Sequence, residues 1–373
     1  MSGPVVLTGG GTGGHLFPLR AIAEALLADG VDPSDLLVVG SRRGQERELL
    51  GDLGVELVLL PGRGLRRDVS LRAALANLAA VAGLALALAR GIVVVARRRP
   101  RAVVSVGGYA AFAAAAAAVV TGRPLVLVDL DATPGLVHRL LRPFAVAITA
   151  AFPGGPEDRV VVTGAPLRAE ILAVARTADA RAVGRGRLGL PPTGAVVAVT
   201  SGSLGAASVN RATCELAVRW RDREATMLYH VTGRRDVDEV EARKRAEGIG
   251  DDRWRVVGFE SAMADLWAAC DVAVTRAGAT TVAELCATGV PSVLVALPGA
   301  PGDHQSANAR VLERAGAAVV LTDATLSGQV LDEALDELLG DPARLAAMSS
   351  AARSLARPDA AGRIAQVVLD HVR

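Results

Sequence analysis

Short apolar runs, many rich in β-branched residues, recur along the first half of the chain, each followed by a helical pattern or a glycine-rich stretch. Continuous apolar runs of this kind are typical of strands buried on both faces of a parallel sheet. The runs in this half are Val5–Thr8, Leu36–Val39, Val55–Leu60, Ala102–Ser105 and Leu125–Val128. They predict strands that alternate with helices around one parallel sheet.

The same pattern starts again after Arg168, with helical segments at Thr280–Thr288 and Gln305–Ala315. Its apolar runs are Val196–Thr200, Met227–Val231, Arg255–Val257, Val272–Thr275 and Ser292–Ala296. Two successive series predict an α/β protein with two doubly wound, Rossmann-like domains, whose ligands bind near the carboxyl ends of the strands. A length of 373 residues also favours two domains over one.

The predicted hinge between the domains is Thr163–Arg168, which contains both glycine and proline. We place the first domain at residues 1–165 and the second at residues 166–357. Residues 358–373 open with the helix start signal Pro358-Asp359 and continue as a helix over about Ala360–Val372. We expect this last helix to return to the first domain.

Composition excludes several classes of protein. Hydrophobic residues make up 51% of the chain and charged residues 21%, as in globular proteins. The formal net charge is only +2, so the total charge does not indicate a nucleic-acid partner. Cys214, Cys270 and Cys286 are widely spaced and fit neither a disulfide nor a zinc framework, which favours a reducing cytosol. Because Pro4–Leu7 runs directly into a glycine-rich loop, we expect no signal peptide.

The stretch Ala73–Ala96 is apolar enough to suggest a transmembrane helix, but Asn77, Gly83, Arg90 and Gly91 interrupt it. A spanning helix here would place the two halves of one sheet on opposite sides of a bilayer. Arginines flank the stretch, at Arg63, Arg66, Arg67, Arg72, Arg97, Arg98, Arg99 and Arg101. Two interpretations remain: a helix buried against the sheet, or a helix whose apolar side dips into an anionic membrane surface. The arginine cluster favours the second.

A glycine-rich stretch, Thr8–His15, lies between the first predicted strand and a helix with apolar positions at Leu19, Ile22 and Leu26. Glycines at such a turn let the backbone approach a ligand, and a helix N-terminus favours negative charge. A dinucleotide site would also need an acidic residue at the end of the second strand, where this chain has Val39-Gly40-Ser41. The histidine at the end of the loop is more informative, because nicotinamide enzymes have no need of an imidazole there.

Four further stretches lie at predicted strand–helix junctions: Gly107–Tyr109, Ser201–Ala206, Arg276–Glu284 and Asp303–Asn308. Taken singly, each has a structural explanation, such as a tight turn, or Thr280 or Thr281 capping a helix with Glu284 as a partner for its dipole. The functional interpretation is that Glu284 binds both hydroxyls of a ribose while the small residues approach a diphosphate. The agreement among these junctions predicts a nucleotide-sugar site.

In this order, five motifs resemble those of the bacterial lipid II synthases, the MurG family of inverting GT-B glycosyltransferases. They are G-G-T-G-G-H at Gly10–His15, G-G-Y at Gly107–Tyr109, T-G-x-P-x-R at Thr163–Arg168, R-A-G-A-x-T-x-x-E at Arg276–Glu284 and D-H-Q-x-x-N-A at Asp303–Ala309. The resemblance runs almost from end to end. It implies a GT-B fold, with two Rossmann-like domains facing a central cleft. The implied reaction moves GlcNAc from UDP-GlcNAc to the 4-hydroxyl of MurNAc in undecaprenyl-pyrophosphoryl-MurNAc-pentapeptide, which converts lipid I to lipid II in peptidoglycan synthesis.

The resemblance also implies roles for single residues. His15 corresponds to the general base, and an imidazole suits proton transfer at neutral pH. Glu284 corresponds to the ribose-binding carboxylate, and Gln305 to the glutamine that binds the sugar hydroxyls. The other implied donor-side positions are Thr12, Gly13, Gly14, Arg168, Ser203, Ala279, Thr280, Thr281, Val282 and Ala283, and the acceptor-side positions are Gly107, Gly108 and Tyr109.

The resemblance implies that no metal and no other cofactor is needed, because helix N-termini and Arg168 meet the charge on the leaving UDP. The family's apolar, arginine-flanked segment implies a peripheral protein at the cytoplasmic face of the cell membrane, in contact with anionic lipid. Other proteins of cell-wall synthesis are candidate partners, and nucleic acid is not.

The chain departs from the family's pattern at several positions. Val128–Gly135 replaces the usual H-E-Q-N-x-x-P-G, so Asp131 stands where an asparagine contacts the donor sugar. An ionised carboxylate accepts hydrogen bonds but donates none, and it repels a diphosphate. Leu204 and Ala207 replace a glutamine and an arginine in the phosphate loop, and Glu260 replaces an apolar residue near the uracil site. These changes bear on donor geometry, donor identity and rate.

Several alternatives stay open. A related GT-B transferase with another nucleotide sugar or a diacylglycerol-like acceptor is favoured by Asp131. A non-catalytic paralogue that binds UDP-sugar or lipid is favoured by the altered Asp129–Asp131 stretch, and disfavoured by the retention of His15, Glu284 and Gln305. A UDP-GlcNAc 2-epimerase shares the fold and the donor but needs no membrane-facing helix. A nicotinamide oxidoreductase lacks its ribose-binding acid.

Overall fold

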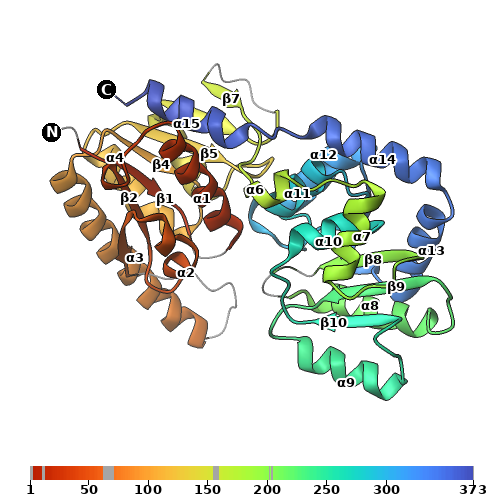
Figure 1. Ribbon diagram of the computed structural model, residues 1–373. Coiled ribbons are helices and arrows are strands. Elements are labelled where there is room, and N and C mark those ends of the chain that lie inside the picture. Colours follow the sequence, from red (N-terminus) through yellow and green to blue (C-terminus); the bar gives the residue numbers. More distant parts are fainter. Residues whose placement is uncertain are drawn as a thin grey trace. The chain divides into compact units, whose positions relative to one another are not determined.

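The computed structural model describes residues 3–10, 13–61, 71–153, 159–200, 202 and 205–372, with the backbone alone for residues 71–79 and 301 (Figure 1). The chain folds into two compact units. Unit 1 comprises Met1–Arg168 and Arg357–Arg373, and unit 2 comprises Ala169–Ala356. The first unit therefore ends at Arg168, where the sequence analysis had placed a boundary after residue 165.

The described part of unit 1 has a sheet of seven parallel strands in the order β3-β2-β1-β4-β5-β6-β7. The strands are β1 (Val5–Thr8), β2 (Leu36–Ser41), β3 (Glu56–Leu60), β4 (Ala102–Ser105), β5 (Leu125–Asp129), β6 (Ala147–Ala150) and β7 (Val160–Val162). The strands β6 and β7 were not predicted. The first is short and built largely of small residues, and the second is a three-residue edge strand without a fully buried position.

Two layers of helices cover this sheet, because right-handed crossovers place connections that run in opposite directions along a sheet on opposite faces. One layer contains α1 (Gly13–Ala28), α2 (Glu46–Leu50) and α15 (Ala360–Asp370), and Figure 1 shows α15 beside α1. The other contains α3 (Leu71–Arg98), α4 (Phe112–Val120) and α5 (Leu136–Leu141). Single 3₁₀ turns complete the unit: η1 (Pro33–Asp35), η2 (Gly51–Leu53), η3 (Tyr109–Ala111) and η4 (Arg142–Phe144).

The two longest helices of the second layer approach each other closely. The alanines of α4 from Ala113 to Ala118 are buried, and an ideal Cβ at Gly91 of α3 would lie 2.7 Å from the carbonyl oxygen of Ala113. Gly91, which interrupts the apolar pattern of α3, therefore permits this packing. Away from this contact, α3 exposes Val81, Leu86 and Val93. Because β3 and β4 belong to one sheet, α3 cannot span a bilayer, as the sequence analysis had argued.

The described part of unit 2 repeats the plan with six parallel strands in the order β10-β9-β8-β11-β12-β13. They are β8 (Ala195–Thr200), β9 (Thr226–Val231), β10 (Trp254–Val257), β11 (Val272–Thr275), β12 (Ser292–Val295) and β13 (Ala318–Leu321). The edge strand β13 was not predicted. Cys214, Cys270 and Cys286 are buried free thiols in this unit, as the spacing had predicted, and burial raises the pKa of the first two to about 11.

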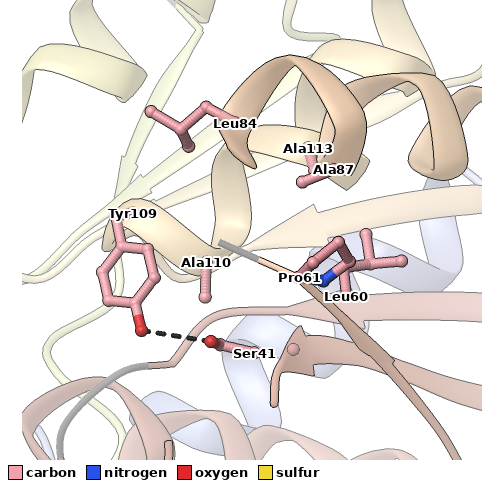
Figure 2. A pocket seen from close by; sticks show the side chains of 9 residues that line it. Ser41, Leu60, Pro61, Leu84, Ala87, Tyr109, Ala110 and Ala113 are labelled. Atoms are coloured by element: carbon pink, nitrogen blue, oxygen red, sulfur yellow. Dashed lines mark hydrogen bonds between the residues drawn. The ribbon is translucent and has the colours of Figure 1, made fainter. Parts of the chain in front are cut away.

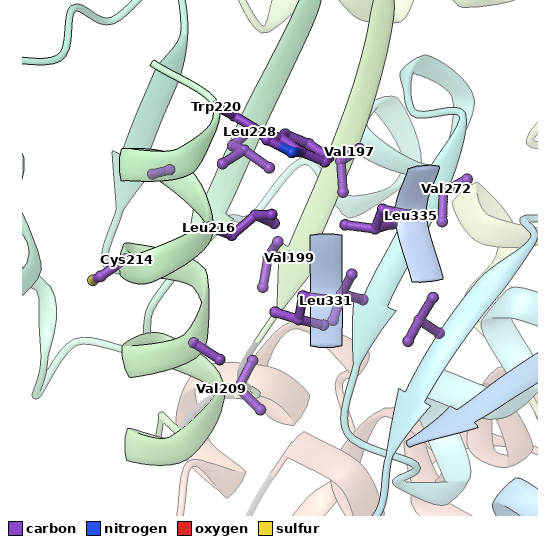
Figure 3. Packing of buried hydrophobic residues seen from close by; sticks show 14 of the residues in the cluster. Val197, Val199, Val209, Cys214, Leu216, Trp220, Leu228, Val272, Leu331 and Leu335 are labelled. Carbon is purple, nitrogen blue, oxygen red and sulfur yellow. The ribbon is translucent and has the colours of Figure 1, made fainter. Parts of the chain in front are cut away.

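The helices of unit 2 also form two layers. One contains α8 (Ala207–Arg219), α9 (Val237–Glu247) and α13 (Gly328–Leu339). The other contains α6 (Ala169–Leu172), α7 (Ala178–Arg187), α10 (Met263–Ala269), α11 (Ala279–Thr288), α12 (His304–Arg314) and α14 (Pro342–Leu355), with the turns η5 (Pro301–Asp303) and η6 (Asp323–Thr325) on the connections. Figure 3 shows Leu216 of α8 and Leu331 of α13 directed at Val199 in the sheet.

Each sheet has one point at which the strand order reverses. In unit 1, the neighbours β1 and β4 send the chain in opposite directions, and in unit 2 the neighbours β8 and β11 do the same. Open α/β sheets bind ligands at the carboxyl ends of the strands at such switch points. The predicted loops therefore belong where ligands are expected: those after Thr8 and Ser105 in unit 1, and those after Thr200 and Thr275 in unit 2.

Candidate active site

The switch point of unit 1 holds His15 against the loop that follows β4. His15 is the third residue of α1 and is half-buried. An ideal Cβ on Gly107 would lie 3.6 Å from Cδ2 of His15, and one on Gly108 would lie 3.4 Å from its Nδ1. Both glycines have positive φ, +95° and +81°. The two glycines thus form the seat of the imidazole, and a side chain on Gly108 would also meet the carbonyl oxygen of Gly10 at 2.7 Å.

Behind this seat lies a buried polar network that the sequence analysis did not predict. Ser105 Oγ is 2.9 Å from Nε2 of His138, and Nδ1 of His138 is 2.6 Å from Oδ1 of Asp129. Nη1 of Arg142 donates to the other oxygen of Asp129 at 2.7 Å. Ser105 is fully buried, so it is no accessible nucleophile despite its Ser–His–Asp arrangement. The ring of His138 lies 3.7 Å from an ideal Cβ on Gly107, so the network supports the glycine that seats His15.

A buried carboxylate occupies the other side of the glycine-rich loop. Glu46 is fully buried at the start of α2, and its Oε1 accepts the backbone N–H of Ser41 at 2.8 Å. An ideal Cβ on Gly10 would lie 2.3 Å from this oxygen, and one on Gly44 would lie 2.0 Å from Oε2. The glycines at these positions therefore make room for the carboxyl group, which links the loop after β1 to the end of β2.

Tyr109 packs at the rim of a small apolar pocket. Its hydroxyl donates to Ser41 Oγ at 3.1 Å, as Figure 2 shows. The pocket is lined mainly by side chains of β3, α3, η3 and α4, among them Leu60, Leu84 and Ala113. A tyrosine packed in this way is a structural explanation of the motif.

Two predicted donor-side residues of unit 1 lie near these loops. The guanidinium carbon of Arg168 lies 4.4 Å from the ring centroid of Phe17, which is two residues after His15 on α1. Such stacking helps to hold the guanidinium in place. Asp131 follows the carboxyl end of β5 and is half-buried, in the turn that leads to α5.

The switch point of unit 2 presents the N-terminus of α11. The helix begins at Ala279, and Gly278 is its N-cap, with no side-chain capping bond among the described residues. The prediction that Thr280 or Thr281 caps the helix is therefore wrong, because both residues already lie in its first turn. Uncapped backbone N–H groups with the positive end of the dipole are a ready binding site for an anion.

Glu284 lies one turn further along α11, in its second turn rather than its first. It is 7% exposed, and Oε2 accepts the indole N–H of Trp267 at 2.9 Å. Ala279, Thr280, Thr281 and Ala283 are half-buried around it, and Val282 is fully buried in the core. A buried carboxylate beside an uncapped helix N-terminus is suited to bind the hydroxyls and the phosphates of a nucleotide together.

Comparison with known proteins decides the family. The models of the glycosyltransferase family 28 N-terminal and C-terminal domains match residues 5–150 and 196–364. A protein of Alkalilimnicola ehrlichii is 40% identical over the full length of both chains, and it is named UDP-N-acetylglucosamine–N-acetylmuramyl-(pentapeptide) pyrophosphoryl-undecaprenol N-acetylglucosamine transferase. The chain belongs to the MurG family of glycosyltransferases.

Solved structures agree with this assignment. A crystal structure of MurG from Acinetobacter baumannii superposes with a TM-score of 0.74 at 25% identity, covering 98% of this chain and 99% of that one. A putative UDP-N-acetylglucosamine 2-epimerase of Listeria monocytogenes superposes with a TM-score of 0.67 at 17% identity, covering 100% and 97%, and shares the fold alone. The predicted GT-B class with two Rossmann-like domains is confirmed, and so is the prediction of a MurG-type glycosyltransferase.

The MurG-family motif at Asp303–Ala309 places two amides at the end of β12. Oε1 of Gln305 accepts the backbone N–H of Leu297 at 2.9 Å, so this oxygen is already bonded to the protein. Asn308 is fully buried and donates to the carbonyl oxygen of Ala277 at 3.0 Å. The second residue therefore ties α12 to the loop that precedes α11 and does not itself face a ligand.

Arg276, the basic residue of the motif before α11, is committed to the protein. Its guanidinium donates to Asp323 at 2.6 Å, to Ser208 at 2.8 Å and to the carbonyl oxygens of Val295 and Ala296. It connects the loop after β11 with the start of α8. We therefore assign it a structural role.

Glu260 is also engaged with the protein. Its carboxylate accepts the hydroxyl of Tyr229 at 2.5 Å and the backbone N–H of Ala262 at 2.6 Å. Burial, together with this hydrogen bond, raises the pKa of Tyr229 well above its usual range. The neighbouring Phe259 is exposed, with the guanidinium of Arg234 at 4.6 Å from its ring centroid. The carboxylate of Glu260 thus stabilises the turn after β10 through its bonds to Tyr229 and Ala262.

Some predicted residues lie outside the described residues. These are Thr12, Ser203 and Leu204, whereas Gly13 and Gly14 form the first turn of α1. Over the described ranges, no group of three or more histidine, cysteine or acidic side chains is arranged to hold a metal ion.

Proposed function

We propose that the chain moves GlcNAc from UDP-GlcNAc to the 4-hydroxyl of MurNAc in undecaprenyl-pyrophosphoryl-MurNAc-pentapeptide, converting lipid I to lipid II. Relatives that carry this activity in their name are 34–40% identical over nearly their whole length. The observation that carries the proposal is the seat of His15, an imidazole held on two positive-φ glycines at the switch point of an α/β sheet. Peptidoglycan synthesis is the process that such a reaction serves.

His15 is the general base in this proposal. Its Nδ1 is buried toward Gly108, so Nε2 is the nitrogen we assign to the acceptor hydroxyl. The acceptor oxygen forms a bond to C1 of GlcNAc while the bond from C1 to the β-phosphate oxygen breaks. The hydroxyl proton passes to His15, and UDP leaves with the electron pair. In-line attack on the α-linked donor inverts the configuration and gives a β-1,4 linkage.

Donor binding is assigned mainly to unit 2. The diphosphate lies at the N-terminus of α11, from Ala279 to Ala283, and the ribose hydroxyls bind the carboxylate of Glu284. Gln305 and Asp131 bind the sugar hydroxyls, and Ser203 contacts a phosphate. Thr12, Gly13 and Gly14 approach the donor sugar and the acceptor diphosphate. Helix N-termini and Arg168 offset the charge on the leaving UDP, so the proposal requires no metal.

We also propose that the protein is peripheral, at the cytoplasmic face of the cell membrane, and that α3 makes the contact. By length and composition, Ala80–Arg98 is apolar enough to cross a membrane, with a mean hydropathy of 1.9, yet only 22% of it is buried. In the same layer, α5 and the turn after it expose Leu136, Leu140 and Phe144. Arg90, Arg97 and Arg139 are exposed nearby in sequence, as expected for a surface that meets anionic lipid heads.

Vesicle binding tests the membrane contact. Sedimentation with vesicles that contain phosphatidylglycerol should carry the protein down, and replacing Val81, Leu86 and Val93 by serine should reduce the bound fraction severalfold. Val183→Ser is the matched control, because Val183 is 52% exposed on α7 of unit 2. Equal binding by all three proteins would contradict the assignment of α3.

A second candidate function is transfer of a different nucleotide sugar, and Asp131 is the observation that favours it. A carboxylate at this position cannot donate a hydrogen bond to a sugar carbonyl or hydroxyl oxygen as an amide can. A donor whose hydroxyl donates to the carboxylate would fit the position better. Donor competition separates the two candidates.

The deciding experiment is transfer of radiolabelled GlcNAc from UDP-GlcNAc to a short-chain lipid I analogue. Unlabelled UDP-GlcNAc, UDP-GalNAc and UDP-glucose are added in turn as competitors, and EDTA is present throughout. Product that only unlabelled UDP-GlcNAc suppresses, formed in the presence of EDTA, supports the reaction, the donor and the absence of a metal requirement together. Product that another sugar nucleotide suppresses more strongly would favour the second candidate. Measurable UDP binding without any transfer would contradict both candidates and favour the non-catalytic paralogue.

A further inference from the structure

A buried tryptophan holds the carboxylate assigned to the ribose. Trp267 is fully buried on α10, and its indole N–H donates to Oε2 of Glu284 at 2.9 Å. An indole N–H donates and cannot accept, so it holds one carboxylate oxygen as its acceptor. A donor of this kind also stabilises the ionised carboxylate at a site that is only 7% exposed.

Side-chain hydrogen bonds to backbone carbonyl oxygens hold both helices of this contact. Arg176 donates through Nη1 to the carbonyl oxygens of Trp267 at 2.7 Å and of Cys270 at 2.9 Å, at the end of α10. On the partner helix, Thr288 donates to the carbonyl oxygen of Glu284 at 2.7 Å. Trp267 is fully buried, and α10 packs on α11. The indole donor and the carboxylate therefore lie on two helices that are packed together and bonded at their backbones.

We infer that Trp267 is a positioning residue, which sets the orientation of the Glu284 carboxylate that recognises the ribose hydroxyls. This inference rests on the proposed function, in which Glu284 binds the ribose. A carboxylate oriented before the nucleotide arrives loses less freedom on binding, and its lone pairs already point where the hydroxyls will lie. Without the indole N–H, the same carboxylate would be buried with one donor fewer and would have to be reoriented by the ligand.

A purely structural bond is the competing explanation, and unit 2 contains a matched case. The indole N–H of Trp220 donates to Oδ1 of Asp332 at 2.6 Å, between the end of α8 and α13. Since α8 starts at the carboxyl end of β8, its last turn lies at the opposite edge of the sheet from the switch point. Trp220→Phe removes the same kind of hydrogen bond without touching the proposed donor site.

Binding of UDP and of 2′-deoxy-UDP, measured by calorimetry, separates the two explanations. The wild-type protein should prefer UDP, because the deoxy compound lacks a hydroxyl for Glu284. Trp267→Phe should weaken UDP binding about 5- to 10-fold, which is within the usual range for the loss of one hydrogen bond, and should weaken 2′-deoxy-UDP binding much less. The ratio of the dissociation constants of 2′-deoxy-UDP and UDP should therefore be smaller in Trp267→Phe than in the wild type. We call this ratio the ribose preference. In Trp220→Phe the preference should stay at the wild-type value, even if the melting temperature falls.

Three further proteins make the outcome decisive. Glu284→Gln should itself narrow the preference, and adding Trp267→Phe to it should change little, since the two side chains act together. Placing 3-benzothienylalanine at position 267 keeps the shape of the ring and removes the N–H, so it replaces Trp267→Phe if that variant fails to fold. Suppose that the preference for UDP over 2′-deoxy-UDP stays at the wild-type value in the Trp267 variants and becomes smaller in Glu284→Gln. This result would overturn the inference about Trp267 alone. A wild-type preference in Glu284→Gln would overturn the ribose assignment in the proposed function, and this inference with it.

Discussion

The two units share one topology but equip their switch points differently. In unit 1, the loops after β1 and β4 contain glycines that make room for side chains, the imidazole of His15 at Gly107 and Gly108 and the carboxyl of Glu46 at Gly10. In unit 2, the helix after β11 opens at the N-cap Gly278, which makes no side-chain capping bond among the described residues, and Glu284 lies in the second turn. The first arrangement presents a proton acceptor, the imidazole of His15. The second presents the positive end of a helix dipole together with a carboxylate that accepts hydrogen bonds.

This difference indicates a division of labour within the GT-B fold. A group that takes a proton from the acceptor must be accessible and rigidly held, and His15 is half-buried on a rigid seat. A group that holds the ribose, far from the bond that breaks, contributes the same binding energy before and during the reaction, as Glu284 would. Removing the first should therefore lower turnover, and removing the second should lower affinity.

The largest effect is expected at the proton acceptor. His15→Ala should reduce turnover by roughly 100-fold or more, because no other group on the seat replaces the imidazole. The affinity for UDP, measured by calorimetry, should stay nearly unchanged. Equal losses of turnover and of UDP binding would place His15 in the donor site and break the comparison between the units.

The seat itself is the next test. Gly108→Ala should lower turnover about 10-fold and destabilise the protein by about 1 to 3 kcal/mol, since the residue has a φ of +81° and the added carbon meets the carbonyl oxygen of Gly10 at 2.7 Å. Gly54→Ala is the matched control, because Gly54 has a φ of +70° with no described atom within 4 Å of an ideal Cβ. Thermal unfolding and transfer assays compare them. A similar loss of turnover in both variants would show that backbone strain, rather than the seat, is responsible.

On the donor side, Glu284→Gln should raise the dissociation constant of UDP about 10-fold, because a neutral amide accepts weaker hydrogen bonds from the ribose. The rate at saturating donor should change little. Glu333→Gln on α13 is the control, since Glu333 is exposed and pairs with Gln329. An unchanged affinity of Glu284→Gln for UDP would show that the carboxylate does not bind the nucleotide.

The smallest expected effect concerns a histidine that takes no part in the reaction. His230 of β9 is fully buried, and burial lowers its pKa to about 3. Below pH 6.5 the unfolded chain therefore binds a proton that the folded unit does not. Stability from this source is complete above pH 6.5 and falls by about 1.4 kcal/mol per pH unit as the pH drops toward 3.

Tryptophan fluorescence measures this prediction in unit 2 alone, since Trp220, Trp254 and Trp267 all belong to it. Urea unfolding at pH 4.5, 5.5 and 7.5 should show a shallower decline in stability for His230→Gln than for the wild type. An equal decline in both would mean that His230 is protonated in the folded unit, and unit 2 would then resemble unit 1 in holding an accessible imidazole.

The sequence predicted the layers of the fold well, because buried parallel strands leave continuous apolar runs. Every predicted strand is present, and Leu19, Ile22 and Leu26 are fully buried on α1 as their spacing indicated. The missed strands β6, β7 and β13 are short or lie at a sheet edge, where partial burial weakens the apolar signal. The cap of α11 was missed because Gly278 takes the N-cap position without a side-chain bond.

The candidate site was predictable only where its residues are close in sequence. Glycines that precede a histidine or a glutamate at a strand–helix junction identified Gly10–His15 and Arg276–Glu284 as parts of the site. Partners brought together by sheet order left no local signal: Ser105 meets His138 across 33 positions and Trp267 meets Glu284 across 17. An aspartate at the end of β5 followed by a buried histidine on the next helix is the one trace that pointed to the first network.

The most direct test of the division between the units is a single-turnover measurement with saturating UDP-GlcNAc and lipid I analogue. Under these conditions donor affinity no longer limits the rate. The account predicts that His15→Ala is slower than the wild type by roughly 100-fold or more, while Glu284→Gln transfers GlcNAc at close to the wild-type rate. A Glu284→Gln protein as slow as His15→Ala, or a His15→Ala protein at the wild-type rate, would contradict it.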